Sequence, residues 1–285
     1  MVARRYIHSE PTSRLAIWAR RTAFFAAAAT ILAIIIVRSN LLEIWPALAT
    51  FGGALVIAVF ALLLALAAFV VIWMEGLAGI GAALGAMAIS LALLAYPAYL
   101  GLRAHRLPWI YDITTDPIDP PRYEALARLR PRDANPVAYA GLATAEQQRM
   151  AYPDIGPLGT NATAQSAYDA ALAVVNKRRW RVVEARAPQA GRRDGRIEAV
   201  ARTPIMGFRD DVVVRIREEP DGARIDARSS SRYGWFDFGA NASRIRSLIN
   251  DIEDAIKTQK PERPPPTRLP APKSTTAGKK DQPKR

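Results

Sequence analysis

The stretch from Ile44 to Met74 decides what kind of molecule this is, and it reads IWPALATFGGALVIAVFALLLALAAFVVIWM. It contains no charged residue and is far longer than the roughly 18 apolar residues that indicate a membrane-spanning helix. It lies within a larger charge-poor block, from Thr22 to Leu102, whose only charges are Arg38, Glu43 and Glu75. A block of this kind predicts helices that cross a bilayer, because only helices satisfy their backbone polar groups there.

The three charges divide the block into three spans, at about 22–42, 46–74 and 77–102. A carboxylate at the bilayer centre costs about 2.5–3.5 kcal/mol, so we expect Glu75 and Gly76 in a turn at the membrane surface. Gly81 and Gly85 give the third span a G-x-x-x-G pattern that permits close helix approach. We expect this face to pack within the three-helix bundle, with a homo-oligomer as the alternative.

Arginines set the expected orientation of the chain. Residues 1–21 contain Arg4, Arg5, Arg14, Arg20 and Arg21, whereas Arg38 alone follows the first span. The positive-inside rule therefore predicts a cytoplasmic segment 1–21, and an odd number of spans then places the C-terminal half in the periplasm of a multi-pass inner-membrane protein. If the first run did not span, that half would be cytoplasmic.

Composition excludes several kinds of chemistry. The chain has no Cys and only two His, His8 and His105, so thiolate catalysis, disulfides and His- or Cys-based metal sites are not expected. We predict no cofactor, no metal and no catalytic residue. The net charge of +13 is concentrated in the two tails rather than along the folded part, which argues against a nucleic-acid partner.

The second half of the chain predicts a small α+β domain. Residues 103–159 are interrupted by prolines and indicate a connector with short helices near 122–130 and 143–150. Periodicity then predicts a helix over 163–178, four strands and a helix over 239–257 that covers the apolar side of the sheet. The strands are expected at 180–187, 197–203, 212–217 and 223–230.

The predicted unit, residues 160–258, is therefore α-β-β-β-β-α, an antiparallel four-stranded sheet with both helices on one face. The other face carries charged side chains and is expected to need no cover. The last segment, 259–285, is basic and rich in Pro, and composition predicts a disordered tail. Such a tail could dock on an anionic envelope polymer or lipid surface.

Residues 196–217 read RIEAVARTPIMGFRDDVVVRIR, and residues 224–246, after a Pro-Asp-Gly turn, read RIDARSSSRYGWFDFGANASRIR. This sequence resembles domain-of-unknown-function family 1499 over roughly residues 107–257, most specifically at 208–212 and 228–246. Members of that family resemble bacterial envelope or plastid proteins, several with N-terminal membrane segments. The resemblance implies a fold and supplies no activity.

Polar residues near the end of the sheet are the candidate binding site. Asp210 and Asp211 are adjacent at the start of a strand, so their side chains point to opposite faces, and turn and strand-end hydrogen bonding with Arg209 or Arg232 is the structural interpretation. The loop 229–241 leads into the last helix, whose free N–H groups attract anions, although Asp237 is well placed to cap that helix. The nine candidates are Asp210, Asp211, Arg228, Ser229, Ser231, Arg232, Asp237, Asn241 and Arg244.

Two functions follow from these patterns. The first is a non-enzymatic inner-membrane protein that holds a periplasmic domain for binding or envelope maintenance. The second is an enzyme that acts on an anionic envelope component through the loop from Ser229 to Asn241. A third interpretation, a cytoplasmic domain that binds anionic lipid or nucleic acid through the basic tail, depends on the reversed orientation.

Overall fold

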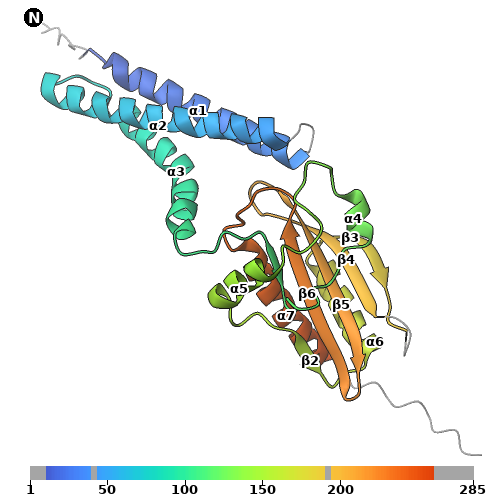
Figure 1. The fold of residues 1–285 in the computed structure, drawn as a ribbon. Helices are drawn as coiled ribbons and strands as arrows, with labels where there is room; N and C mark the ends of the chain where they lie inside the picture. The colour runs from blue at the N-terminus through green and yellow to red at the C-terminus, as the bar shows by residue number, and fades with distance from the viewer. Residues whose placement is uncertain (1–10, 40–43, 190–193, 260–285) are drawn as a thin grey trace, which may run out of the picture.

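The computed structural model describes residues 11–39, 44–189 and 194–259. Its first part consists of three long helices, α1 (Arg14–Ser39), α2 (Ile44–Glu75) and α3 (Ile80–Ala104), each long and apolar enough to cross a membrane (Figure 1). The prediction of three membrane-length helices is confirmed. α1 begins earlier than the expected residue 22, and the Ser13 hydroxyl accepts a hydrogen bond from the Ala16 amide in its first turn.

Alanines form the contact surface between these helices. The buried residues recur at spacings of three, four and seven, which keeps them on one stripe of each helix: Ala16, Ala19, Ala23, Ala26 and Ala33 of α1, and Ala47, Ala54, Ala58, Ala61, Ala65 and Ala68 of α2. Small side chains let helix backbones approach closely, which compensates for the lack of a hydrophobic driving force in lipid. We call this contact surface the alanine seam.

The turn between α2 and α3 is fixed to the start of α1. The Ser13 amide donates to the Ala78 carbonyl at 2.9 Å, and the Ala78 amide donates to the Pro11 carbonyl at 3.2 Å. The start of α1 and the α2–α3 turn therefore lie at one end of the bundle. The end of α1, the start of α2 and the end of α3 lie toward the domain, and the second half of α3, which contains Pro97, turns toward it (Figure 1).

The glycine face of α3 differs from the expectation. A Cβ atom added to Gly81 or Gly85 would meet no atom within 4 Å, so in the described residues this face does not pack within the bundle. The residues of α3 that are buried are Ala83, Ala86 and Ser90, which lie on another side of the helix. The prediction that Gly81 and Gly85 pack inside the three-helix bundle is wrong.

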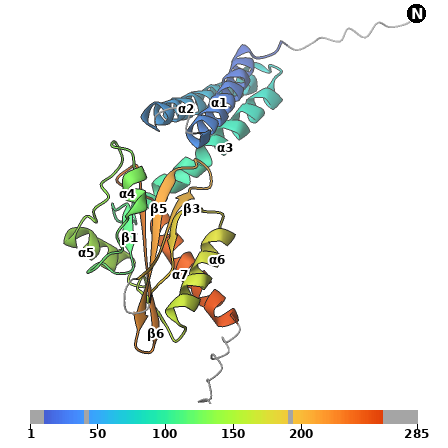
Figure 2. The ribbon, with the colours of Figure 1, turned by 90° about the vertical axis from the view of Figure 1, so that its right-hand side faces the viewer.

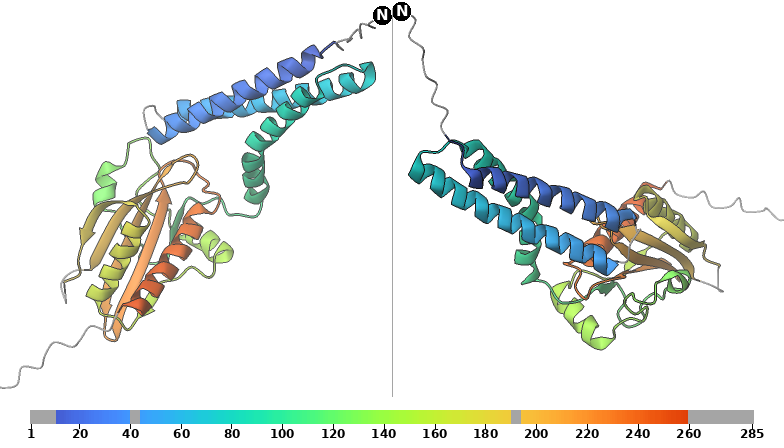
Figure 3. Two further views of the ribbon diagram at one scale, coloured as in Figure 1. Left: turned by 180° about the vertical axis from the view of Figure 1, so that it is seen from behind. Right: turned by 90° about the horizontal axis from the view of Figure 1, so that it is seen from above.

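The domain is built on an antiparallel sheet. Its four main strands are β3 (Arg181–Arg186), β4 (Gly195–Arg202), β5 (Arg209–Glu219) and β6 (Gly222–Ser231), and α6 (Ala164–Lys177) and α7 (Ala240–Thr258) cover one face (Figure 3, left). The expected four-stranded sheet with two helices on one face is confirmed. Thr163 caps α6 by accepting a hydrogen bond from the Ser166 amide at 3.2 Å.

Two short strands extend this sheet beyond β6. β1 (Asp112–Thr114) and β2 (Leu158–Thr160) both pair with β6, and the order along the main path is β1-β6-β5-β4-β3. Both strands come from the segment expected to be a connector. Three-residue strands lack the alternating pattern that reveals longer ones, and pairing with β6 rather than local sequence holds them in place.

The core lies between the sheet and the two helices. Its fully buried side chains alternate along the strands as expected, with Ile197 and Ala199 on β4, Val212, Val214 and Ile216 on β5, and Ile225 and Ala227 on β6. Ala167, Tyr168, Ala171 and Val175 of α6 and Leu248 and Ile252 of α7 meet them. This core positions the strand ends that carry the candidate residues.

The other face of the sheet is covered as well, contrary to the expectation that it needs no cover. α4 (Ala125–Leu129) lies across it, on the opposite side from α6, whereas α5 (Leu142–Ala151) lies beside β1 (Figure 2). Leu126 and Tyr123 pack there against Val200 and Val213. The buried carboxylate of Glu198 accepts hydrogen bonds at 2.7 Å from the amides of Glu124 and Leu126, so a strand residue caps this short helix.

Candidate functional site

The structure brings the nine predicted residues to one end of β5 and β6, but divides them between the two faces of the sheet. Asp210 pairs with Arg244 of α7 on the helix-covered face, whereas Asp211 pairs with Arg130 and Arg232 on the α4 face. The prediction that the two aspartates point to opposite faces is confirmed. They therefore cannot act together on one substrate group.

On the helix-covered face, Asn241 is the centre of a closed network. Its side-chain oxygen accepts from the Ser229 hydroxyl at 2.7 Å, and its side-chain nitrogen donates to the Tyr111 carbonyl and the Ser231 hydroxyl, both at 2.9 Å. Arg244 donates to Ser229, Asn241 and Asp210. These side chains join the start of α7 to the ends of β5 and β6.

Asp237 caps the start of α7, as its position in the sequence predicts. Its carboxylate accepts from the amides of Gly239 at 2.8 Å and Asn241 at 2.9 Å. The positive end of the helix is thus already occupied by a carboxylate of the chain itself. An added anion would have to displace it.

On the α4 face, Asp211 is held between two guanidinium groups. Arg130 approaches one carboxylate oxygen at 2.8 and 2.9 Å, and Arg232 approaches the other at 2.7 and 2.8 Å. Arg209, the alternative partner expected from the sequence, does not bind either aspartate in the described structure. Arg228 binds Asp112 through two bonds of 2.6 and 3.0 Å, a partner that sequence reasoning missed.

Burial governs the acidity of these carboxyl groups. Burial raises the pKa of Asp210 despite the opposing Arg244 charge, and burial likewise raises the pKa of Asp237 against the hydrogen bonds from the Asn241 and Gly239 amides. A raised pKa is a common feature of general acids, but a general acid must also reach a substrate. Both carboxyl groups are buried and engaged by the chain itself.

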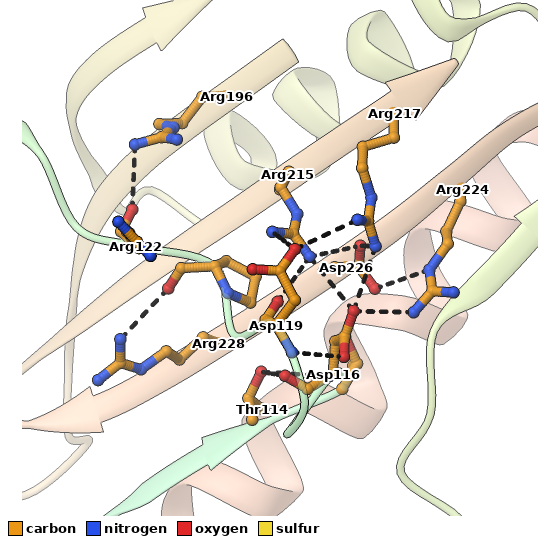
Figure 4. A network of polar contacts seen from close by, with 12 residues as sticks. Thr114, Asp116, Asp119, Arg122, Arg196, Arg215, Arg217, Arg224, Asp226 and Arg228 are labelled. Carbon is orange, nitrogen blue, oxygen red and sulfur yellow. Dashed lines mark hydrogen bonds and ion pairs between the residues drawn. The ribbon is translucent and has the colours of Figure 1, made fainter. Parts of the chain in front are cut away.

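A second ion-pair network lies farther along the same face as Arg228. Arg215, Arg217 and Arg224 surround the carboxylates of Asp116, Asp119 and Asp226, at distances from 2.8 to 3.4 Å (Figure 4). The arginines were visible in the sequence as the polar side of two strands. Asp226 was visible on the same polar side, whereas Asp116 and Asp119 were not, because they come from the segment that precedes α4.

A cleft of about 320 Å³ is present on the α4 face, near the ends of β4 and β5, and most of its lining lies outside the predicted site. Six arginines line it, namely Arg178, Arg179, Arg181, Arg202, Arg209 and Arg232, with Trp180, Leu129, Val183 and Val200 as apolar neighbours. Arg232 is the one residue shared with the prediction. The sequence signal was the cluster RRWR at 178–181, which sequence reasoning did not use.

Within the described residues, His and acidic side chains do not gather into a group of three or more that could hold a metal ion. A search of curated proteins returns no match to the chain. A family model described as a protein of unknown function, DUF1499, matches residues 112–252, a range that runs from β1 into α7 and includes all nine predicted residues. The three apolar helices precede this range, and the domain formed by residues 112–252 makes the chain a member of the DUF1499 family.

Proposed function

We propose that the protein is a non-enzymatic inner-membrane protein that holds its DUF1499 domain in the periplasm, where the domain acts as a binding module in envelope maintenance. The single observation that carries this proposal is a contrast between two groups of polar residues. The candidates at the start of α7 satisfy one another, as the network around Asn241 illustrates. The arginine cleft instead offers side chains that remain available to a ligand.

Catalysis requires groups that touch the reacting atoms of a substrate. The carboxylates of Asp210, Asp211 and Asp237 are buried and bound to arginines or backbone amides of the same chain, which favours a structural role for them. An enzyme acting through the loop from Ser229 to Asn241 would have to break this network in order to bind its substrate. Binding at a preformed cleft needs no such change.

The proposed orientation is supported by the distribution of arginines and by the order of the three helices. Five arginines precede Thr22, and three spans carry the chain to the opposite side of the membrane before the domain begins. The end of α1 also contacts the domain, because the Arg38 side chain donates to the carbonyls of Pro204 and Ile205 at 2.7 and 3.0 Å. This contact agrees with α1 ending on the side where the domain lies.

Reporter fusions after Lys257 test the orientation. We expect alkaline phosphatase, which is active only outside the cytoplasm, to be active at this position, and green fluorescent protein exported through the general secretion pathway to remain dark. A fusion after Glu75 serves as the control and should give the opposite pair of results. Fluorescence of the green fluorescent protein fusion after Lys257, together with no activity of the phosphatase fusion there, would contradict the proposal and favour a cytoplasmic domain.

A further inference from the structure

The cleft on the α4 face contains an unusual concentration of like charge. Arg202, the last residue of β4, lies directly opposite Arg209, the first residue of β5. Arg181, the first residue of β3, pairs with Val200 of β4, and the amide of Arg232, directly after β6, bonds to the Arg209 carbonyl, so four arginines lie at the neighbouring ends of four strands. Like charges directly opposite in a sheet repel each other, so the fold gains nothing from this row by itself.

Four of the cleft arginines have guanidinium groups without a partner among the described residues. Arg232 is paired with Asp211, and Arg178 is paired with Asp251. In the described part of the chain, by contrast, no hydrogen bond or ion pair is made by the guanidinium groups of Arg179, Arg181, Arg202 and Arg209, and no acidic residue lines the cleft. Burial and the charges of Arg202, Arg232 and Arg181 lower the pKa of Arg209 below its ordinary value.

Elsewhere on the same face of the sheet, the arginines are paired with acidic side chains and stabilise the fold. Arg215, Arg217 and Arg224 share three aspartates (Figure 4). Arg228 is paired with Asp112. This half of the face is therefore balanced by acidic side chains of the chain itself. Among the described residues the cleft half has no such balance, so its arginines are free to meet the charge of an anionic ligand.

Arg179 also stands where the backbone favours glycine. It follows α6 and has φ +56°, and the Arg179 and Trp180 amides bond back to the carbonyls of Asn176 and Val175. This is the Schellman arrangement, in which the residue in the left-handed conformation is usually Gly. A non-glycine residue there strains the backbone, and the strain is tolerated at a position that lines the cleft.

The cleft lies at the end of the sheet that faces the membrane helices. Arg202 and Arg209 flank the loop between β4 and β5, and this loop receives the two hydrogen bonds from Arg38 at the end of α1. The approach is close: a Cβ on Gly207, which has φ +72°, would lie 2.9 Å from the Arg38 Cγ atom. Because α1 is a membrane-length helix, its end marks the bilayer surface, and the cleft lies within the reach of lipid headgroups.

We propose that the arginine cleft binds a phosphate group, presented by an anionic lipid of the leaflet next to the domain. Guanidinium groups bind phosphate oxygens through paired N–H donors, and several converging arginines match the charge of such a group. A volume of about 320 Å³ is at the lower end of small-molecule sites, which span roughly 300–1,000 Å³. This proposal rests on the binding function proposed above and names the class of ligand. It does not depend on which side of the membrane the domain occupies.

The test measures binding by the full chain in a non-ionic detergent. Dihexanoyl phosphatidylglycerol, dihexanoyl phosphatidylcholine and inorganic pyrophosphate are each titrated, and binding is read from the rise in the thermal unfolding temperature and from adducts in native mass spectrometry. We expect phosphatidylglycerol to bind, and the Arg202→Gln/Arg209→Gln variant to bind it at least about tenfold more weakly, since the variant loses two charged hydrogen-bond donors. The variant's unfolding temperature without ligand should not fall, because neither guanidinium has a partner in the part of the chain that the structure describes.

Two further variants separate binding from folding and from net charge. Arg122→Gln/Arg132→Gln removes the same charge from exposed positions outside the cleft and should bind like the wild type. Arg179→Gly should raise the unfolding temperature without ligand and still weaken binding, which a merely structural role for Arg179 would not produce.

Binding of pyrophosphate that depends on Arg202 and Arg209, without binding of phosphatidylglycerol, would keep the phosphate site and assign it to a soluble ligand. The proposal is overturned if neither phosphate probe binds the wild type, or if both bind the Arg202→Gln/Arg209→Gln variant as tightly. These results are independent of the fusions after Lys257, so failure of the orientation and failure of the cleft are distinguishable.

Discussion

At the scale of single residues, buried ion pairs distinguish this domain from one held together by an apolar core alone. Arg228 lies between the rings of Tyr123 and Tyr139, with its Cζ atom 4.7 and 5.5 Å from their centroids, and binds Asp112 with both side chains almost fully buried. Burial also raises the pKa of Tyr139 to about 12. Such a pair fixes geometry, because each charge is costly to bury without the other.

Replacing one member of this pair should therefore be severe. We expect Arg228→Met to lower the free energy of unfolding by about 3–5 kcal/mol, because it leaves the Asp112 carboxylate buried and unpaired. Arg228→Lys should recover little, since an ammonium cannot form the two parallel bonds. Urea unfolding followed by fluorescence measures both variants, with Arg122→Met as the exposed control. A loss of less than about 1 kcal/mol, the range of exposed ion pairs, would mean that the pair is not a structural element.

Asp116 gives a second prediction, on pH dependence. Burial raises its pKa, but the hydrogen bond from the Asp119 amide and the charges of Arg224 and Arg215 outweigh burial, so the pKa lies below its ordinary value of 3.8. A carboxyl group whose pKa is lower in the folded state stabilises the fold above the unfolded-state pKa, and this stabilisation is lost as the pH falls through the folded-state pKa.

We therefore expect Asp116→Asn to be less stable than the wild type at pH 7, by about 1–3 kcal/mol. The difference between the two should shrink as the pH falls below about 4, because the wild-type carboxyl group is then protonated as well. Urea unfolding at a series of pH values measures this, with Asp221→Asn in the exposed β5–β6 turn as the control. A difference that stays constant down to pH 2 would show that Asp116 contributes through shape rather than charge.

At the scale of secondary-structure elements, the alanine seam holds the membrane helices together. Ala61 of α2 is fully buried in one cluster with Ala19 and Ala23 of α1 and Ala86 of α3, so there is no room for a larger side chain. Overpacking a filled interface costs about 1–3 kcal/mol.

Ala61→Leu should accordingly lower the thermal unfolding temperature of the full chain in detergent. Ala67→Leu is the matched control, because Ala67 is exposed on the same helix and leucine is equally apolar. Equal unfolding temperatures for the two variants would show that α1, α2 and α3 do not pack through this seam.

The sequence predicted the long helices of the domain well and missed its shortest strands. Long periodic segments such as 163–178 and 239–257 predicted α6 and α7 closely, since one burial pattern fixes a whole helix. β1 and β2 were missed because each has three residues and depends on β6 for its hydrogen bonds. The glycines of α3 were placed inside the bundle, although alanines provide the contacts there.

The candidate site was also predicted only in part, because local sequence rules do not reveal contacts between distant segments. Local rules identified Asp237 as a helix cap and separated Asp210 from Asp211. Partners distant in sequence, such as Asp112 for Arg228 and Arg130 for Asp211, are set by the path of residues 112–136 across the sheet. The arginine cleft is also assembled from distant segments, so its charge was visible in the sequence only as the cluster at 178–181 and as single arginines at 202, 209 and 232.

At the scale of the whole molecule, the membrane helices and the domain meet at one end of the sheet. Trp109, directly after α3, stacks on Phe236 at 5.2 Å between ring centroids, and Phe236 lies 4.4 Å from Phe238. Trp235 of the same loop is 78% exposed. Aromatic side chains of this kind are typical of membrane–water interfaces. Together with Arg38 and the arginine cleft, they make this end of the domain suited to contact with a bilayer.

The orientation of the whole molecule is tested most directly by cysteine labelling, because the chain has no Cys of its own. A single cysteine is introduced as Ser243→Cys on the exposed surface of α7 or as Glu75→Cys at the α2–α3 turn, and cells with a permeabilised outer membrane are treated with a membrane-impermeant maleimide. We expect Ser243→Cys to be labelled in these cells and Glu75→Cys only after lysis. Labelling of Glu75→Cys before lysis, with Ser243→Cys protected, would contradict a periplasmic domain held by three membrane spans.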